Sequence, residues 1–107
     1  MNNEKIHACP VQTCLNFTSD KWKILIIRDL LNGTKRFNEL KKSLAPVTQK
    51  MLTQQLREME NDGLVHREVY PVVPPKVEYS LTDLGLSLQP VIESMKTWGT
   101  NYKNIKL

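Results

Sequence analysis

One stretch, residues 46–64, constrains the fold of this chain more than any other. Thr48 is suited to cap a helix, because its hydroxyl can accept a hydrogen bond from an amide of the first turn. Val47 and Leu52 have the spacing of a hydrophobic staple, and Gly63 supplies a left-handed stop at the other end. The sequence therefore predicts a helix whose start and end are both marked.

This predicted helix has one apolar side and one polar side. At about 100° per residue, Leu52, Leu56 and Met59 fall together. Gln and Arg, which recur on the other side, carry forked donors that match base edges in the DNA major groove. An ordinary solvated face is the alternative interpretation. The polar side spans an arc of about 140° and consists of Gln49, Lys50, Thr53, Gln54 and Arg57.

The residues before this helix favour the DNA-binding interpretation. A short helix is predicted over residues 38–44, and Phe37 and Leu40 supply its inward side. Residues 35–37 can form a brief strand ahead of it. Pro46 then forces a turn, because proline cannot continue a helix. A short helix, a tight turn and a capped longer helix form the helix-turn-helix pattern.

After the long helix the apolar period changes from helical to alternating. Residues 65–69 and 77–81 each alternate apolar and polar side chains, which predicts two antiparallel strands. The connection, residues 70–76, contains three prolines, so it is stiff and cannot pair as a central strand. A hairpin with a rigid, cation-bearing tip after a helix-turn-helix is the winged-helix arrangement. Its wing can lie along the DNA backbone or in the minor groove.

Two more helices are predicted before the helix-turn-helix. Pro10 is favoured at the first position of a helix and opens one over about residues 9–18. Ser19 or Asp20 then caps a second helix, residues 21–31. This second helix is the most apolar element, and we expect it to be the central core helix.

The C-terminal part predicts a long amphipathic helix over about residues 83–104, interrupted by Pro90 near residues 87–88. Its apolar stripe is longer than the remaining core of a small domain can cover. We therefore expect its distal half, with the first helix, to pack against a second copy; packing against the chain's own domain is the alternative. The predicted interface residues are Val11, Leu15, Ile92, Met95, Trp98 and Tyr102.

Length and composition bound the remaining possibilities. The 107 residues suffice for one α+β, mainly helical domain, with a DNA-binding core over about residues 20–82. No apolar run is long enough to span a membrane and the polar N-terminus lacks a signal-peptide core, so we expect a cytoplasmic location. No nucleophile–base pairing, phosphate loop or metal-ligand motif is found, so neither an enzyme nor a cofactor is expected.

The net charge of +4 is concentrated around the helix-turn-helix. Between Lys35 and Lys76, eight Lys and Arg residues stand against five acids. A polyanionic partner is the simplest reason for this excess. Outside the long helix, the cations predicted to contact phosphate or to raise the local potential are Lys35, Arg36, Lys41, Lys42, Arg67 and Lys76.

Several blocks of the sequence resemble the HxlR-type regulators, which are bacterial winged-helix transcription factors related to the MarR group. The blocks occur in family order and include Cys9-Pro10 and residues 35–40, 49–58, 62–67 and 74–82. The resemblance implies a homodimeric, DNA-binding transcriptional regulator. In such a dimer, the two polar helices would enter successive major grooves of a palindromic operator, about 34 Å apart.

Cys9 is a candidate redox sensor. As the predicted N-cap of the first helix, Cys9 faces the positive end of the helix dipole, with Lys5 and His7 nearby in the sequence. Such a setting favours the thiolate form of a cysteine. Some relatives in the resembled family use the cysteine of the matching Cys-Pro pair to sense oxidants or electrophiles. An inert buried thiol is the alternative. Cys14 lies nearly opposite around the helix and is predicted to be core.

A winged helix used only for contact with another protein is the alternative function. Its polar helix face would then bind no nucleic acid. Binding to DNA weakens with salt, at a log–log slope of about −0.9 per phosphate contact, whereas the alternative predicts no DNA affinity at all. The residues identify no effector molecule.

Overall fold

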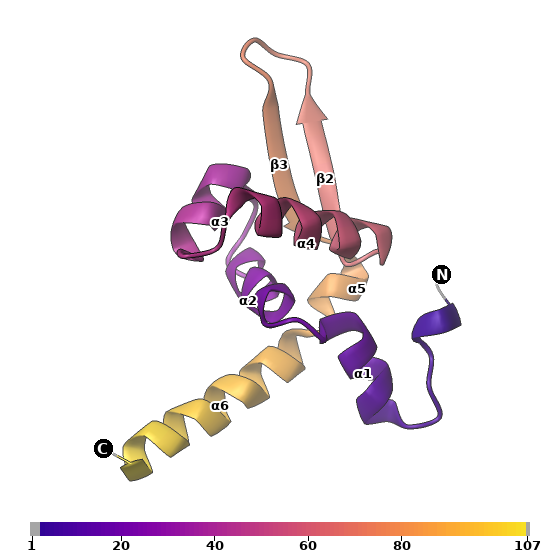
Figure 1. Cartoon of the computed structure of the whole chain (residues 1–107), viewed down its shortest axis with the longest axis vertical. Coiled ribbons are helices and arrows are strands. Elements are labelled where there is room, and N and C mark those ends of the chain that lie inside the picture. The colour runs from indigo at the N-terminus through magenta and orange to yellow at the C-terminus, as the bar shows by residue number, and fades with distance from the viewer. Residues whose placement is uncertain (1–2, 107) are drawn as a thin grey trace.

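The computed structural model describes residues 3–106, with side chains from 4 to 105; residues 1, 2 and 107 of the predicted domain lie outside this range. The predicted mainly helical, winged helix-turn-helix fold is confirmed (Figure 1). In chain order the elements are η1 (Asn3–Lys5), α1 (Pro10–Thr18), α2 (Lys21–Leu30), β1 (Lys35–Arg36), α3 (Phe37–Ser43), α4 (Gln49–Asn61), β2 (Val65–Tyr70), β3 (Lys76–Leu81), α5 (Asp83–Leu86) and α6 (Gln89–Lys106).

Side-chain caps fix where α2 and α4, the two longest helices before the wing, begin. Thr48 Oγ1 accepts a hydrogen bond from Met51 N at 3.1 Å, as its position predicted. Asp20, not Ser19, caps α2, because Asp20 Oδ1 accepts from Trp22 N at 2.8 Å. Each cap satisfies an amide that has no partner within its helix.

Local hydrogen bonds also set the other boundaries of the helix-turn-helix. Helix α3 begins at Phe37, one residue earlier than predicted, and Arg36 N donates to Glu39 Oε1 at 2.8 Å just ahead of its first turn. Gly63, with φ +79°, ends α4. The chain then turns back so that Leu64 N donates to Met59 O at 2.9 Å, the reversal that glycine permits.

The core lies between α2, α3, α4 and the base of the sheet. Trp22 on α2 is buried, in keeping with the prediction that this helix is the central core helix. The apolar side of α4 is almost fully buried, so the helical period correctly predicted which side of this helix faces inward. The largest side chains less than 2% exposed, with Leu56 at that limit, are Ile26, Ile27, Leu40, Leu52, Leu56, Met59 and Leu64.

The wing is the longer part of a three-stranded antiparallel sheet. Strand β3 lies between β1 and β2, so the predicted two-stranded hairpin gains the short β1 at its base. Directly paired residues of antiparallel strands point to the same face of the sheet. One face, on the side of α4, therefore carries Lys35, Tyr79 and Arg67, and the other carries Arg36, Glu78 and Glu68.

The predicted interruption of the last helix is confirmed as a break between α5 and α6 at residues 87–88. Pro90 lies in the first turn of α6, where a missing amide costs nothing. Gly85 lets α5 pack closely against the sheet base, since a Cβ there would lie 2.3 Å from Leu64 O. Helix α6 then extends away from the body (Figure 1). None of the helices in residues 3–106 is both long and apolar enough to cross a membrane.

Candidate nucleic-acid interface

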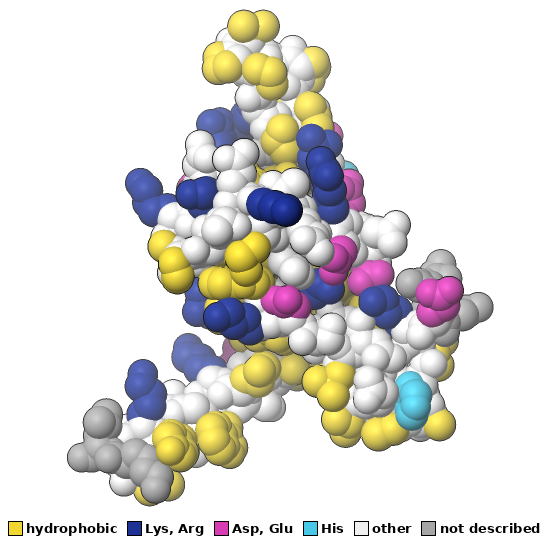
Figure 2. Space-filling model, in the orientation of Figure 1, with side chains coloured by type: hydrophobic (Ala, Val, Ile, Leu, Met, Phe, Trp, Pro, Cys, Tyr) yellow, Lys and Arg dark blue, Asp and Glu magenta, His cyan; other side chains and the backbone are white. Residues whose placement is uncertain are grey.

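The polar side of α4 gathers the five predicted side chains on one surface. Gln49, Lys50, Gln54 and Arg57 are exposed, and Thr53 is half-buried. Figure 2 shows Lys and Arg side chains spread over α3, α4 and the base of the wing, with acidic side chains toward the C-terminal end of α4. The N-terminal half of α4 therefore offers the least repulsion to a polyanion.

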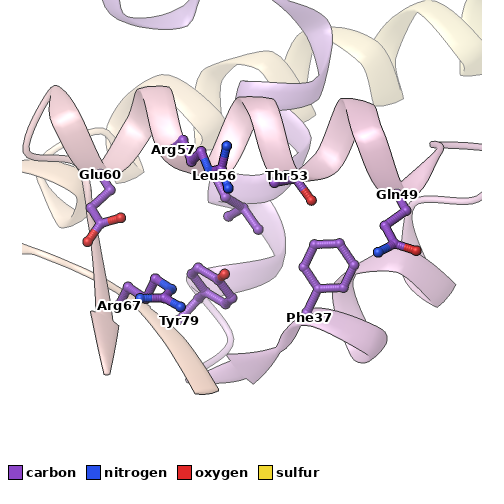
Figure 3. Close-up of a pocket in the computed structure, with 8 residues that line it drawn as sticks. All are labelled: Phe37, Gln49, Thr53, Leu56, Arg57, Glu60, Arg67 and Tyr79. Carbon is purple, nitrogen blue, oxygen red and sulfur yellow. The ribbon is translucent and has the colours of Figure 1, made fainter. Parts of the chain in front are cut away.

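A groove of about 420 Å³ separates α4 from the wing. Figure 3 shows Arg57 on α4 and Arg67 on β2 facing the same hollow from its two walls. Two guanidinium groups aimed at one hollow suit the oxygens of a phosphate backbone. The remaining lining residues are Phe37, Gln49, Thr53, Leu56, Glu60 and Tyr79.

A buried lysine, Lys23, orients Gln54 through Glu58. The sequence did not predict this pair of hydrogen bonds. Lys23 Nζ on α2 donates to Glu58 Oε1 at 2.8 Å, and Gln54 Nε2 donates to Glu58 Oε2 at 3.2 Å. The Lys23 hydrogen bond, followed by that of Gln54, lowers the pKa of Glu58 below its ordinary value. With its amide nitrogen held by Glu58, Gln54 presents its amide oxygen as an acceptor, which suits the amino groups of adenine or cytosine.

A second polar contact under α4 was also missed. Gln55 is buried, and its Nε2 lies 3.4 Å from Asp20 Oδ2, the other oxygen of the carboxylate that caps α2. The signal for this contact is present in the sequence, because Gln55 falls on the apolar side between Leu52 and Met59. The start of α2 and the middle of α4 are therefore held together by polar as well as apolar contacts.

Lys35 does not lie in the α4–wing groove. It lines a separate hollow with Asp29 and Glu39, between the end of α2 and α3. Lys35 therefore shares its hollow with two carboxylate side chains and lies apart from the polar side of α4. Lys41 and Lys42 are exposed on α3.

Arg36 and Lys76 lie on the other face of the sheet, around Glu78. Arg36 pairs in register with Glu78, and Lys76 Nζ lies 3.4 Å from Glu78 Oε2 and 4.8 Å from the centroid of the Tyr70 ring. The Tyr70 hydroxyl, followed by Lys76 and Arg36, lowers the pKa of Glu78, which in turn raises that of Tyr70. The expected cation-bearing tip is wrong: Lys76 is folded onto the stem.

Cys9 is exposed at the N-cap of α1 in the single chain. Its backbone N–H donates to His7 Nδ1 at 2.9 Å. Cys14 is half-buried and lies outside the core cluster, so its prediction as a core residue is wrong. Both cysteines are free thiols. Within the described residues, His, Cys, Asp and Glu form no group of three that could hold a metal ion.

The segment that carries Cys9 contacts the far end of α4. Lys5 Nζ lies 3.2 Å from Asp62 Oδ2 and donates to Asn16 O at 2.8 Å. The Asp62 side chain is only 6% exposed, and Asp62 is the C-cap of α4. A shielded ion pair therefore joins the N-terminal segment to the candidate DNA-contacting helix.

The predicted interface residues lie mainly on open surface. Trp98 is 69% exposed and stacks on Tyr102 with ring centroids 5.4 Å apart. Ile92 is the exception, because it packs against the chain's own core. Figure 2 shows apolar side chains of α1 and α6 at the end of the molecule away from the wing. The exposed members of the predicted set are Val11, Leu15, Met95, Trp98 and Tyr102.

A capped polar helix held by a helix-turn-helix, with a hairpin that shares its groove, defines the winged-helix class of transcriptional regulators. The sequence model of the HxlR-like helix-turn-helix family matches residues 17–106, and the chain belongs to this family. The family assigned from sequence blocks is thereby confirmed, and it is a family of transcriptional regulators rather than enzymes.

Similar proteins are also named as regulators. The chain is 52% identical over 103 residues to the HTH-type transcriptional regulator YdeP of Bacillus subtilis, covering 96% of this chain and 80% of YdeP. The redox regulator HypR in its oxidised form matches with a TM-score of 0.82 and 52% identity, over 87% of this chain and 96% of HypR. The reduced form of the transcriptional regulator YodB from B. subtilis matches with a TM-score of 0.74 and 38% identity, over 86% and 91%.

The Lys23–Glu58 pair generates a prediction about stability. Glu58→Gln leaves the Lys23 ammonium, whose side chain is 7% exposed, without a carboxylate, whereas Lys23→Met removes the buried charge itself. Because Glu58 is 44% exposed, we expect Glu58→Gln to cost about 1–2 kcal/mol, below the roughly 3–5 kcal/mol of a fully buried pair, and Lys23→Met to cost less. Urea unfolding at neutral pH measures both.

The same pair fixes the sign of a pH effect. Since the pKa of Glu58 is lowered by folding from 4.5, its contribution is complete above pH 4.5 and is lost as the pH falls through the lower folded value. Glu58→Gln should therefore show a shallower loss of stability on acidification than the wild type. Equal costs for the two variants, or unchanged acid slopes, would contradict this account.

Proposed function

We propose that two copies of this chain bind double-stranded DNA, with the α4 helices in successive major grooves of a palindromic operator, about 34 Å apart. One observation carries the proposal. The exposed amide and guanidinium groups of α4 sit on a helix anchored from below, and Arg67 of the wing faces Arg57 across a shared groove. A helix that reads a DNA duplex must hold its side chains in fixed positions. The contacts that anchor α4 to α2 hold them in this way.

The side chains divide by chemistry. Gln49, Thr53 and Gln54 are suited to base edges, and Arg57 to guanine O6 and N7 or to a phosphate. Lys50 and Arg67 are suited to the phosphates that flank the DNA major groove. The more distant cations, which raise the positive potential or contact flanking phosphates, are Lys35, Arg36 and Lys76.

Replacement of Arg57 or Lys50 by Ala tests this surface. Arg57→Ala should weaken binding to a selected operator by about 1–3 kcal/mol, or roughly 5- to 150-fold, because a forked donor is lost. Lys50→Ala should reduce the salt slope by about 0.9, the share of one phosphate. Thermal unfolding should stay unchanged, since both side chains are exposed. Gel-shift titration at several salt concentrations gives both quantities.

Lys103→Ala is the matched control, because Lys103 is an exposed cation on α6, outside the proposed surface. It removes the same charge and should leave affinity and slope near those of the wild type. Affinities for DNA that are equal in all four proteins would remove Arg57 and Lys50 from the site. No affinity for any duplex in dilute salt would favour the protein–protein module instead.

The second copy is inferred from the apolar surface of α1 and α6. A monomer would leave Trp98, Met95 and Val11 exposed on elements at the end away from the wing. Closed two-fold pairing buries such a surface against its own copy and matches a palindromic site. Trp98→Ala should therefore shift sedimentation toward the monomer and weaken operator binding, while Thr100→Ala, an exposed polar change on the same helix, should shift neither. A monomeric wild type at micromolar concentration would exclude the dimer.

We also propose that Cys9 makes the regulator responsive to oxidants or electrophiles. HypR is a redox regulator of known oxidised and reduced structure, and the thiol of Cys9 is exposed in this chain. A quinone, for example, would form a carbon–sulfur bond with Cys9 and take its proton onto a ring oxygen. The added group would disturb the segment that Lys5 joins to Asp62, and thereby the end of α4.

Cys9→Ser should keep its affinity for the operator but no longer release it on treatment with a quinone or diamide. Cys14→Ser is the internal control and should respond like the wild type, since that thiol is half-buried. Gel shifts before and after treatment, followed by a reductant for the diamide arm, measure the response. Release of DNA from treated Cys9→Ser would show that Cys9 is not the sensor.

A further inference from the structure

The tip of the wing, residues 71–75, is an exposed apolar point. Val73 is 99% exposed and Val72 is 52% exposed, and the three prolines of the tip are also exposed. No charged residue occurs from 69 to 75. Figure 2 shows this apolar cluster at the end of the wing, beyond the cations of its stem. A wing that only follows phosphates would carry cations there instead.

We infer that this tip is a wedge that enters the minor groove beside each α4 site and opens a base step there, with Val73 as the leading side chain. The inference rests on the proposed binding of DNA. Apolar side chains, proline among them, are the groups that proteins insert between base steps from the minor groove. Insertion would also cover apolar surface that the free chain leaves in water.

The wing has the reach that the wedge requires. Arg67 lines the groove beside α4, and Val73 follows it by six residues along and beyond β2. At about 3.3 Å per residue, the tip can lie up to about 20 Å beyond that groove. Half a helical turn of B-DNA, about 17 Å, separates the major groove under α4 from the next minor groove.

The prolines of the tip and the charges of the stem also favour insertion of the tip into the minor groove. Three prolines stiffen the tip, so little conformational freedom is lost when it is inserted. Lys76 is held between Tyr70 and Glu78 on the outer face, while Arg67 stays on the face toward α4. Phosphate attraction therefore acts at the base of the wing, and the uncharged tip is left to meet the base edges. Flexible pyrimidine–purine steps would cost least to open.

The test uses the full chain and the duplex that binds it best from a random pool. 2-Aminopurine, which brightens when unstacked, replaces each adenine in turn within the segments about half a turn from the α4 sites. The wild type and Val73→Leu should raise the fluorescence at one step per half-site and bend the duplex in a circular-permutation assay. Val73→Ser should bind but lose both the fluorescence increase and the bend. Unfolding should be unaffected, because Val73 is fully exposed.

The outcomes separate this inference from the proposed function. Tight, salt-dependent binding by the wild type with no brightened step overturns the wedge and leaves DNA binding intact. A Val73→Ser complex with unchanged bend and fluorescence also overturns it, because the leading side chain would then not be needed to open the step. Absence of binding by the wild type to every duplex rejects the wedge and the proposed function together.

Discussion

Burial of the apolar side of α4 determines which of its side chains the candidate interface presents. Leu52, Leu56 and Met59 are at most 2% exposed. Replacement of any one of them by Ala would open a cavity and cost roughly 2–5 kcal/mol of stability. That cost fixes the rotation of α4 about its own axis. The rotation of a helix determines the direction in which each of its side chains points. With the apolar side held in the core, the polar side of α4 therefore stays at the surface. The caps at both ends then fix where along the chain this presentation starts and stops.

Polar contacts refine what the apolar core sets. A helix packed only by apolar side chains can slide or rotate slightly at low cost, because such contacts have little directionality. The Lys23–Glu58 pair and the Gln55–Asp20 contact are directional and both join α4 to α2. The desolvation of Lys23 makes the pair a weak source of net stability, so its value lies in orientation. It holds Glu58, which in turn holds Gln54 at the surface.

The parts of this molecule that the sequence predicted well are those set by neighbours in the chain. Caps, the reversal at Gly63, the break before α6 and the apolar side of α4 depend on residues at most a few positions apart. The contacts that were missed join distant positions: Lys23 with Glu58, and Lys5 with Asp62. Neither partner's pattern reveals the other, because a lysine on a helix has the same local pattern whether it is buried or solvated.

The wing shows the same limit in another form. Alternation predicted its strands, and with their register it predicts which residues share a face. It did not predict that Lys76 would be held by Glu78 and Tyr70, so the expected positive tip became an apolar one. Charge counted along a sequence overestimates the charge available to a partner wherever a carboxylate lies within a few ångströms.

The shape of the molecule separates its two proposed contacts. The wing and α6 extend in opposite directions along the longest dimension, 50 Å (Figure 1). In the proposed dimer, a signal that starts at the end formed by α1 and α6 would have to cross the body to reach α4, and a direct contact is the shortest route. Lys5 makes that contact, because it binds Asn16 on α1 and Asp62 at the end of α4. For the proposed response at Cys9, the Lys5–Asp62 ion pair would be the shortest connection to the C-cap of α4, and it would require no movement of the core.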